Sequence, residues 1–254
     1  MKKLLLTIPF LFSILFGQAQ WVSLDVSIGV PQNEFRENTD ATGGGLDLSF
    51  GIPFQKGFPI SFGLDFNYMV YGSNSQDEDL IAEIRAGNTI IDQLVIPLTI
   101  TNTNSIFGTH ALIRAQAPFE LVKPYIEGLA GFRYISTNTK ITDRSFDSRY
   151  SDEDTDVIIR KTVLDDWIWS YGFGGGFMIK IGSSAYIDLR ADFFRGQRAK
   201  YFDASDTEAW NIEFVGASAY DPENLESGDL DFEAQPREST TDLLVIKFGV
   251  AFKI

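Results

Sequence analysis

The sequence contains no cysteine and only one histidine in 254 residues. The absence of cysteine excludes disulfide bonds, thiolate zinc sites and a cysteine nucleophile. With His110 as the only imidazole, no Ser-His-Asp arrangement is convincing, and the sequence motif of a phosphate-binding loop is absent as well. We therefore predict no catalytic residue, no cofactor and no metal site.

Long apolar runs are also lacking, apart from one at the N-terminus. The segment from Leu4 to Phe16 is apolar except at three positions, follows a basic start, and precedes small residues up to Ala19. It is shorter than the ~20 residues that a membrane-spanning helix needs. Basic, apolar and small-residue regions in this order are typical of a secretory signal peptide. We predict a signal peptide at residues 1–19 and one large domain at residues 20–254.

Apolar residues recur at every second position in several segments of this domain. The clearest segments are 46–54, 60–70 and 244–254, which place large and often aromatic side chains on one phase. The other phase holds charged residues and glycine. Such alternation predicts β-strands. A soluble β-sandwich also alternates, but lipid outside and a polar interior explain this division better. In a membrane, strands must form a closed barrel to satisfy their backbone groups.

We predict an all-β fold, in which residues 20–254 form a closed antiparallel transmembrane β-barrel of eight strands with long extracellular loops. Short and long connections alternate along the chain, as in outer-membrane barrels with short periplasmic turns. Residues 90–103 also have the character of a strand, so an extended hairpin and a ten-stranded barrel remain open as alternatives. The predicted strands are 21–30, 44–54, 59–71, 106–117, 124–136, 166–181, 185–194 and 242–254.

Negative charge is concentrated in the long connections. The chain has a formal net charge of −14, and without Lys2 and Lys3 the predicted mature chain has −16. All of this net charge falls in four connections, so the strands and short turns are balanced. Strongly acidic loops disfavour nucleic-acid binding, because nucleic acid is itself an anion. The four connections are 31–43, 72–105, 137–165 and 195–242.

Three motifs support a resemblance to a known family. They are residues 123–132 (KPYIEGLAGF), residues 170–177 (SYGFGGGF), and Asp188-Leu189-Arg190 followed by Gly196 and Tyr201. With these motifs the chain resembles the porin-like outer-membrane β-barrel domain family of Gram-negative bacteria over residues 21–254. The resemblance implies the fold and a cell outer membrane location after export. It implies no catalytic residues, because such domains are mostly without an assigned activity.

The C-terminal residues follow a spacing that is used for sorting. Lys247, Gly249, Phe252 and Ile254 look like the signal that the barrel-assembly machinery reads by pairing with a final strand. Many such strands end in phenylalanine, whereas this chain ends in Ile254. A lipid-facing last strand explains the same apolar residues, and both interpretations can hold together.

The phase between the apolar residues should face the barrel interior. An eight-stranded barrel has an interior just wide enough for side chains to fill, and an isolated buried charge is very costly. We interpret the charges on this phase as a structural salt-bridge network that fills the lumen. A proton or ion pathway and a glycosidase-like carboxylate pair are the alternatives. The predicted network is Asp25, Asp47, Asp65, His110, Arg114, Glu127, Arg133, Lys180, Asp188, Arg190, Asp192 and Lys247.

Residues 152–156 alternate carboxylates like the start of a calcium-binding loop. The EF-hand pattern fails, because Val157 stands where glycine is needed and Val163 where the bidentate glutamate belongs. A solvated acidic loop is the simpler interpretation. Loose divalent-cation binding beside lipopolysaccharide phosphates is the alternative.

Five aromatic residues lie near the starts of predicted strands. Aromatic side chains at strand ends form the interfacial girdles of membrane barrels. A platform that stacks against carbohydrate is the alternative. The five residues are Trp21, Tyr125, Trp167, Trp169 and Tyr171.

Together these features favour a non-enzymatic outer-membrane barrel that displays acidic surface loops for binding, adhesion or envelope integrity. The expected partners are outer-membrane lipid, lipopolysaccharide and the barrel-assembly machinery, with an outer-membrane protein as a further candidate. An accessory subunit of a larger assembly, a small diffusion channel and a barrel enzyme are the alternatives.

Overall fold

The computed structural model describes residues 21–39, 41–55, 58–86, 89–144, 157–203, 211–214, 230–233 and 235–254. The predicted signal peptide at residues 1–19 and the acidic stretch at residues 152–156 lie outside these ranges.

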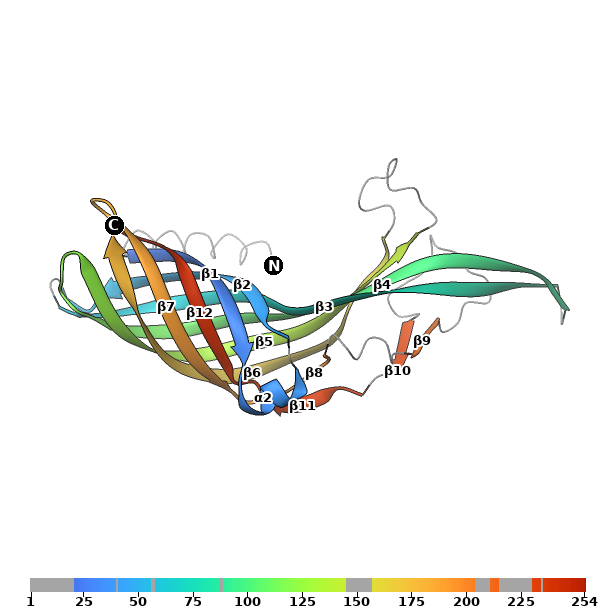
Figure 1. Cartoon of the computed structure of the whole chain (residues 1–254). Coiled ribbons are helices and arrows are strands. Elements are labelled where there is room, and N and C mark those ends of the chain that lie inside the picture. The colour runs from blue at the N-terminus through green and yellow to red at the C-terminus, as the bar shows by residue number, and fades with distance from the viewer. Residues whose placement is uncertain are drawn as a thin grey trace, which may run out of the picture.

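Eight strands form one closed antiparallel barrel, as the sequence predicted (Figure 1). Strand β1 closes the ring by pairing with β12, from Trp21 opposite Lys253 to Pro31 opposite Leu243. The ten-stranded alternative is therefore wrong. The barrel strands are β1 (Trp21–Pro31), β2 (Gly43–Pro53), β3 (Ile60–Ala86), β4 (Thr89–Gln116), β5 (Val122–Asp143), β6 (Val157–Lys180), β7 (Ala185–Gly196) and β12 (Leu243–Lys253).

Smaller elements occur in the connections that join β1 to β2 and β7 to β12. Strand β8 pairs with β11, and β9 pairs with β10. Within the described residues, no helix is long and apolar enough to cross a membrane. The small elements are α2 (Asn33–Asn38), β8 (Arg198–Tyr201), β9 (Asn211–Phe214), β10 (Leu230–Glu233) and β11 (Arg237–Thr240).

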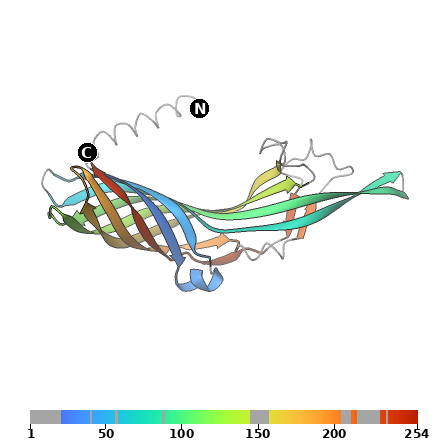
Figure 2. The same ribbon diagram turned by 45° about the horizontal axis from the view of Figure 1, so that its top comes forward.

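Four barrel strands continue far beyond the closed ring and form an extension (Figure 2). Strand β2 pairs with β3 only as far as Val70, and β7 pairs with β6 only as far as Ser170. Past these points β3, β4, β5 and β6 make an open sheet, and the β3–β4 hairpin reaches on to Ala86 and Thr89. At about 3.3 Å per residue, β3 extends roughly 50 Å past Val70.

The extension corrects the predicted loops. Most of residues 72–105 and part of 137–165, predicted as loops, belong to strands, and residues 90–103 lie within β4. The hairpin alternative is therefore confirmed. Near the ring, its register pairs from Ser73 opposite Thr103 to Ser75 opposite Thr101 are hydroxyl and amide residues, which stabilise neighbouring strands without apolar alternation. Ser75 and Thr101, for example, are hydrogen-bonded at 2.9 Å across β3 and β4.

The outer surface of the closed ring is apolar. Large outward side chains such as Leu24, Ile126 and Phe173 are 56%, 70% and 66% exposed. Across β3–β6 this apolar belt ends in a row of aromatic register partners, beyond which serine and threonine take the outward positions. The row consists of Tyr68, Phe107, Tyr134 and Trp167.

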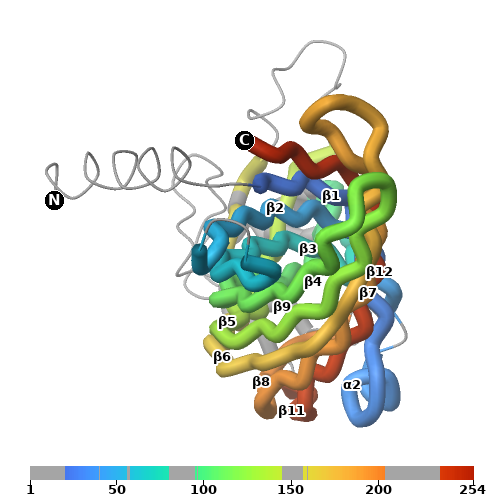
Figure 3. Tube along the Cα trace, turned by 90° about the vertical axis from the view of Figure 1, so that its left-hand side faces the viewer, coloured from blue at the N-terminus to red at the C-terminus, as the bar shows by residue number. Residues whose placement is uncertain are grey.

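The two ends of the ring differ. The turn end holds the short connections and the C-terminus and faces the viewer in Figure 3. The extended end, from which β3–β6 continue, is covered inside by Phe35 of α2. Phe35 is fully buried, and its ring centroid lies 5.8 Å from Tyr71 and 5.2 Å from Tyr201. Tyr201 on β8 is hydrogen-bonded at 2.7 Å to Ser239 on β11. Helix α2 and the β8–β11 pair thus cap the barrel interior.

We predict that Phe35→Ala lowers the free energy of unfolding by about 3–5 kcal/mol, because it opens a cavity beneath the cap. Urea unfolding of the protein in detergent micelles measures this loss. Phe54→Ala is the matched control, since Phe54 is 68% exposed and its truncation opens no cavity. Equal losses for the two variants would contradict a packed cap.

Candidate functional site

The interior of the barrel is the candidate site, because eleven of the twelve residues predicted to face it are buried there. Each of these eleven side chains belongs to a residue at most 5% exposed. They are Asp25 on β1, Asp47 on β2, Asp65 on β3, His110 and Arg114 on β4, Glu127 and Arg133 on β5, Asp188, Arg190 and Asp192 on β7, and Lys247 on β12.

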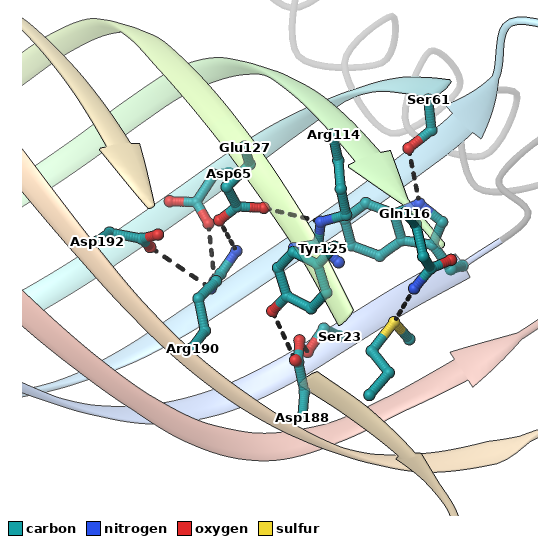
Figure 4. Close-up of polar contacts among 12 residues, drawn as sticks. Ser23, Ser61, Asp65, Arg114, Gln116, Tyr125, Glu127, Asp188, Arg190 and Asp192 are labelled. Carbon is teal, nitrogen blue, oxygen red and sulfur yellow. Dashed lines mark hydrogen bonds and ion pairs between the residues drawn. The ribbon is translucent and has the colours of Figure 1, made fainter. Parts of the chain in front are cut away.

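Arg190 lies at the centre of the network (Figure 4). Its guanidinium contacts four carboxylate oxygens, three of which come from other strands, β1, β3 and β5. One cation on β7 therefore connects strands from opposite sides of the interior. The contacts are Asp65 Oδ2 at 3.1 Å, Glu127 Oε1 at 3.1 Å, Asp25 Oδ2 at 3.5 Å and Asp192 Oδ2 at 3.5 Å.

Lys247 provides a second cation that shares two of these carboxylates. Its Nζ lies 3.1 Å from Asp192 Oδ2 and 3.3 Å from Asp65 Oδ2. It also lies 2.6 Å from Asp47 Oδ1, while the amide of Asn67 donates to Asp47 Oδ2 at 2.9 Å. Because Asp65 and Asp192 contact both cations, Arg190 and Lys247 belong to one continuous cluster.

Arg114 extends the cluster toward the turn end. Its Nε donates to Glu127 Oε2 at 2.7 Å, and its guanidinium carbon lies 3.9 Å from the ring centroids of both Trp21 and Tyr125. A desolvated cation–π contact of this kind stabilises by about 2 kcal/mol. Trp21 and Tyr125 are therefore buried in the interior, and their assignment to an interfacial girdle is wrong. The sequence could have shown this, since Trp21 lies on the same face of its strand as Asp25, and Tyr125 on the same face as Glu127.

The carboxylate of Asp188 and the imidazole of His110 are held by hydroxyl groups of residues that were not predicted to belong to the network. Tyr125 Oη donates to Asp188 Oδ1 at 2.6 Å. His110 Nε2 lies 2.6 Å from Ser170 Oγ, which comes from β6. Tyr125 and Ser170 lie on the inward phase of their strands. That phase was the available signal, but neither side chain is charged.

Arg133 and Lys180 differ from the other predicted cations. Arg133 is buried, donates to the carbonyl of Thr241 at 3.1 Å, and lies 4.4 Å from the Phe194 ring centroid. Lys180 is exposed and forms no ion pair with the residues that the structure describes. The structure thus places Lys180 outside the network, although it lies on the inward phase. It is the last residue of β6 and sits at the turn-end mouth rather than in the interior.

Glycine on β6 and β12 makes room for this cluster. A Cβ on Gly174 would overlap Asp192 Oδ1, and a Cβ on Gly249 would overlap Asp25 Oδ1. Gly249 of the predicted assembly signal therefore has a structural reason inside the barrel. Phe252 and Ile254 of the same signal are 49% and 68% exposed on the outside. Recognition of this signal by the assembly machinery stays a prediction.

The arrangement is suited to holding strands together rather than to acting on a substrate. Asp25, Asp47, Asp65, Glu127 and Asp192 each contact at least one cation. Burying a charge is tolerable only with such partners. Within the described part of the chain, no group of three or more histidine, aspartate or glutamate side chains is arranged to hold a metal. Glu127 is engaged by both Arg114 and Arg190, which leaves no free carboxylate pair around it.

No protein-family model matches the chain, and no curated protein matches it. Among solved structures, the chain is similar to Neisserial surface protein A, with 10% identity, a TM-score of 0.37, and coverage of 92% of this chain and 96% of that one. It is also similar to Ail, the attachment invasion locus protein of Yersinia pestis, with 10% identity, a TM-score of 0.35, and coverage of 92% and 97%.

A third similar structure is a major outer membrane protein from Thermus thermophilus. It shares 12% identity at a TM-score of 0.37, and the match covers 92% of this chain and 99% of that one. At these TM-scores the fold assignment rests on the strand order and register of the chain itself. That order and register give the closed barrel that the resemblance to porin-like outer-membrane domains implied.

We predict that Arg190→Met lowers the free energy of unfolding by about 3–5 kcal/mol, because it leaves buried Asp25 without its cation and removes one of the two cations that contact each of Asp65, Glu127 and Asp192. Arg195→Met is a matched control on the same strand. The Arg195 side chain is 60% exposed and its Nε lies 3.9 Å from Asp242, and exposed pairs contribute only about 0–1 kcal/mol. Denaturant titration in micelles compares the two variants, and a similar loss in both would show that the interior network is not stabilising.

We predict that Gly174→Ala destabilises the barrel by about 1–3 kcal/mol, because the added methyl group forces Asp192 away from its cations. Gly128→Ala on β5 is the control, since its Cβ would meet only Ile113 Cγ2 at 3.5 Å, an ordinary contact. Thermal unfolding in micelles measures both. If Gly174→Ala matched the control, the interior would be looser than the ion-pair distances indicate.

Proposed function

We propose that the chain is a non-enzymatic barrel of the Gram-negative outer membrane, which displays the extension at the cell surface as a binding platform. The main support is that the β3–β4 hairpin, flanked at its base by β5 and β6, continues roughly 50 Å beyond a ring whose interior is filled with paired charges. A filled interior favours display over transport, because a channel needs a continuous path for water.

The outer surface of the ring supports a membrane location. Strands β1, β2 and β12 have 11 residues and β7 has 12, close to the roughly 9–11 residues that a tilted strand needs to cross a bilayer. The apolar belt covers this length, and the row from Tyr68 to Trp167 lies where aromatic girdles occur.

The unequal ends of the ring support one orientation. Outer-membrane barrels have short periplasmic turns and long outer connections. On this basis the turn end faces the periplasm and the extension projects outward, where the acidic long connections also lie. Lipopolysaccharide would then surround the base of the extension, and the barrel-assembly machinery would receive the β12 strand.

The polar side chains of the extension support its use in binding. Ser73 pairs with Thr103 and Ser75 with Thr101 on its outward face. Farther out, Arg144 lies 3.2 Å from Asp77 and 3.4 Å from Asp79. Such a surface offers hydrogen-bonding groups and charge to a partner.

An accessory role in a larger outer-membrane assembly is the second candidate function. Past Val70, β3 pairs with β4 alone among the described strands, so its other edge keeps free backbone donors and acceptors. Such an edge accepts an added strand from a partner.

We predict that the purified protein does not conduct ions. Planar-bilayer recording should show no steady current, because the interior is filled and Phe35 caps one end. Reproducible conductance steps from the wild-type protein would contradict the display proposal and favour a diffusion channel.

Cysteine labelling tests the orientation, since the chain has no cysteine of its own. Ser75 on β3 and Ser183 in the β6–β7 turn are both exposed. A membrane-impermeant maleimide should label Ser75→Cys on intact cells, and Ser183→Cys only after the outer membrane is opened. The reverse pattern would refute the orientation.

For the binding role, a photo-crosslinker at position 75 should give discrete adducts in living cells, and its failure to do so would count against a platform.

A further inference from the structure

The turn-end mouth of the barrel is a cavity of about 410 Å³. Each of the eight barrel strands contributes to the lining the inward residue that lies nearest the turn end. Three of these residues are lysines, Lys123 on β5, Lys180 on β6 and Lys253 on β12. Among the described residues of the lining, Glu120 alone is acidic. The mouth is therefore a positive site on a chain whose net charge is −14.

Each of the three lysines has an aromatic residue as a neighbour on an adjacent strand. Lys123 is half-buried, donates to Tyr186 Oη at 3.1 Å, and lies 4.6 Å from the centroid of that ring. Lys180 is the register partner of Tyr186, and Lys253 is the register partner of Trp21. None of the three lysines forms an ion pair within the described part of the chain. Their charges are thus available to an anion.

Arg114 lies behind the lining and stacks on Trp21, which is itself part of the mouth. Its terminal nitrogens Nη1 and Nη2 are buried and have no hydrogen-bond partner among the described residues, while its Nε is paired with Glu127. The described interior network holds six carboxylates and four cationic side chains, so it adds no net positive charge to the mouth. The attraction of the mouth for an anion therefore comes from the three lysines of the rim.

An apolar groove continues from this mouth onto the outer wall. Two further hollows, of about 320 and 470 Å³, lie beside the mouth. The smaller hollow adjoins the mouth, because both are lined by Pro59. The larger hollow adjoins the smaller one, because both are lined by Ala115 and Ile126. The larger hollow is also lined by Ile113 and Phe173. The small side chain of Ala115 leaves space beside these larger residues. The result is a positive mouth bordered by a shallow apolar groove on the outer wall.

We propose that this hollow is a binding site for one glycerophospholipid, with its phosphate at the lysines of the mouth and an acyl chain in the groove. Lysine ammonium groups bind phosphate as point charges. The groove offers an acyl chain van der Waals contact with the wall, which is the interaction that drives packing inside a lipid phase. A free phosphate would use the lysines but not the groove. The leaflet concerned, the periplasmic one, rests on the orientation given under the proposed function, whereas the site itself does not.

Native mass spectrometry of the detergent-folded protein tests the site with three probes. These are phosphatidylglycerol, diacylglycerol, which lacks the phosphate, and inorganic phosphate, which lacks the chains. We expect one retained phosphatidylglycerol per protein, and weaker retention of either other probe. Equal retention of diacylglycerol would refute phosphate recognition. Retention of inorganic phosphate with no gain for the lipid would refute the groove and leave a simple anion site.

Variants separate the two halves of the site. Lys180→Gln combined with Lys253→Gln should weaken phosphatidylglycerol retention about tenfold, because each interfacial lysine adds attraction to an anionic lipid. Ala115→Phe should also weaken retention by filling the groove. Lys200→Gln, an exposed lysine on β8 at the opposite, extended end of the ring, is the control and should change nothing. Unchanged retention in the first two variants would overturn the proposal. Micelle measurements are independent of orientation, so this outcome is distinguishable from a failure of the cysteine-labelling test.

Discussion

The structure depends on the pairing of charges inside a space too narrow to hydrate them. Arg190 contacts carboxylates on β1, β3, β5 and β7, and Lys247 contacts carboxylates on β2, β3 and β7. Backbone hydrogen bonds hold each strand only to its two neighbours, whereas these side chains join strands across the interior. Gly174 on β6 and Gly249 on β12 follow from this arrangement, because a side chain at either position would occupy the volume of a carboxylate. The apolar exterior is the other side of this division, since the charged residues of the network are turned inward.

Alternation was sufficient to predict the closed ring and the phase of its interior. Asp25 and Glu127 were assigned to the lumen from that phase alone, and both are buried there. Phase does not encode depth, however, and Lys180 shares the inward phase but lies at the open mouth. Chemical type misled the assignment of Trp21, because tryptophan near a strand end resembles an interfacial anchor. Its stacking on Arg114 depends on a contact between β1 and β4 that no local sequence pattern specifies.

The extension was harder to predict because, near the ring, its outward positions lack the apolar side chains that mark the ring strands. Within the ring, the contrast between an apolar outside and a polar inside marks each strand clearly. Past Val70, serine, threonine and asparagine pair across β3, β4 and β5, as Asn104 does with Thr137 at 2.7 Å. Both faces are then partly polar, so the periodic signal fades although the backbone pairing continues. A short apolar stretch at residues 90–103 was the part of the signal that remained.

The position of Lys247 on β12 has a consequence for the order in which the barrel can assemble. Strand β12 is the last in the chain and also the one whose pairing with β1 closes the ring. Until it arrives, Asp47 lacks the cation that lies 2.6 Å from it in the finished barrel. An incomplete sheet of the first seven ring strands therefore keeps a charge that must remain hydrated, and so cannot collapse into a dry interior. Sealing of the wall and expulsion of water from the lumen thus become a single cooperative event.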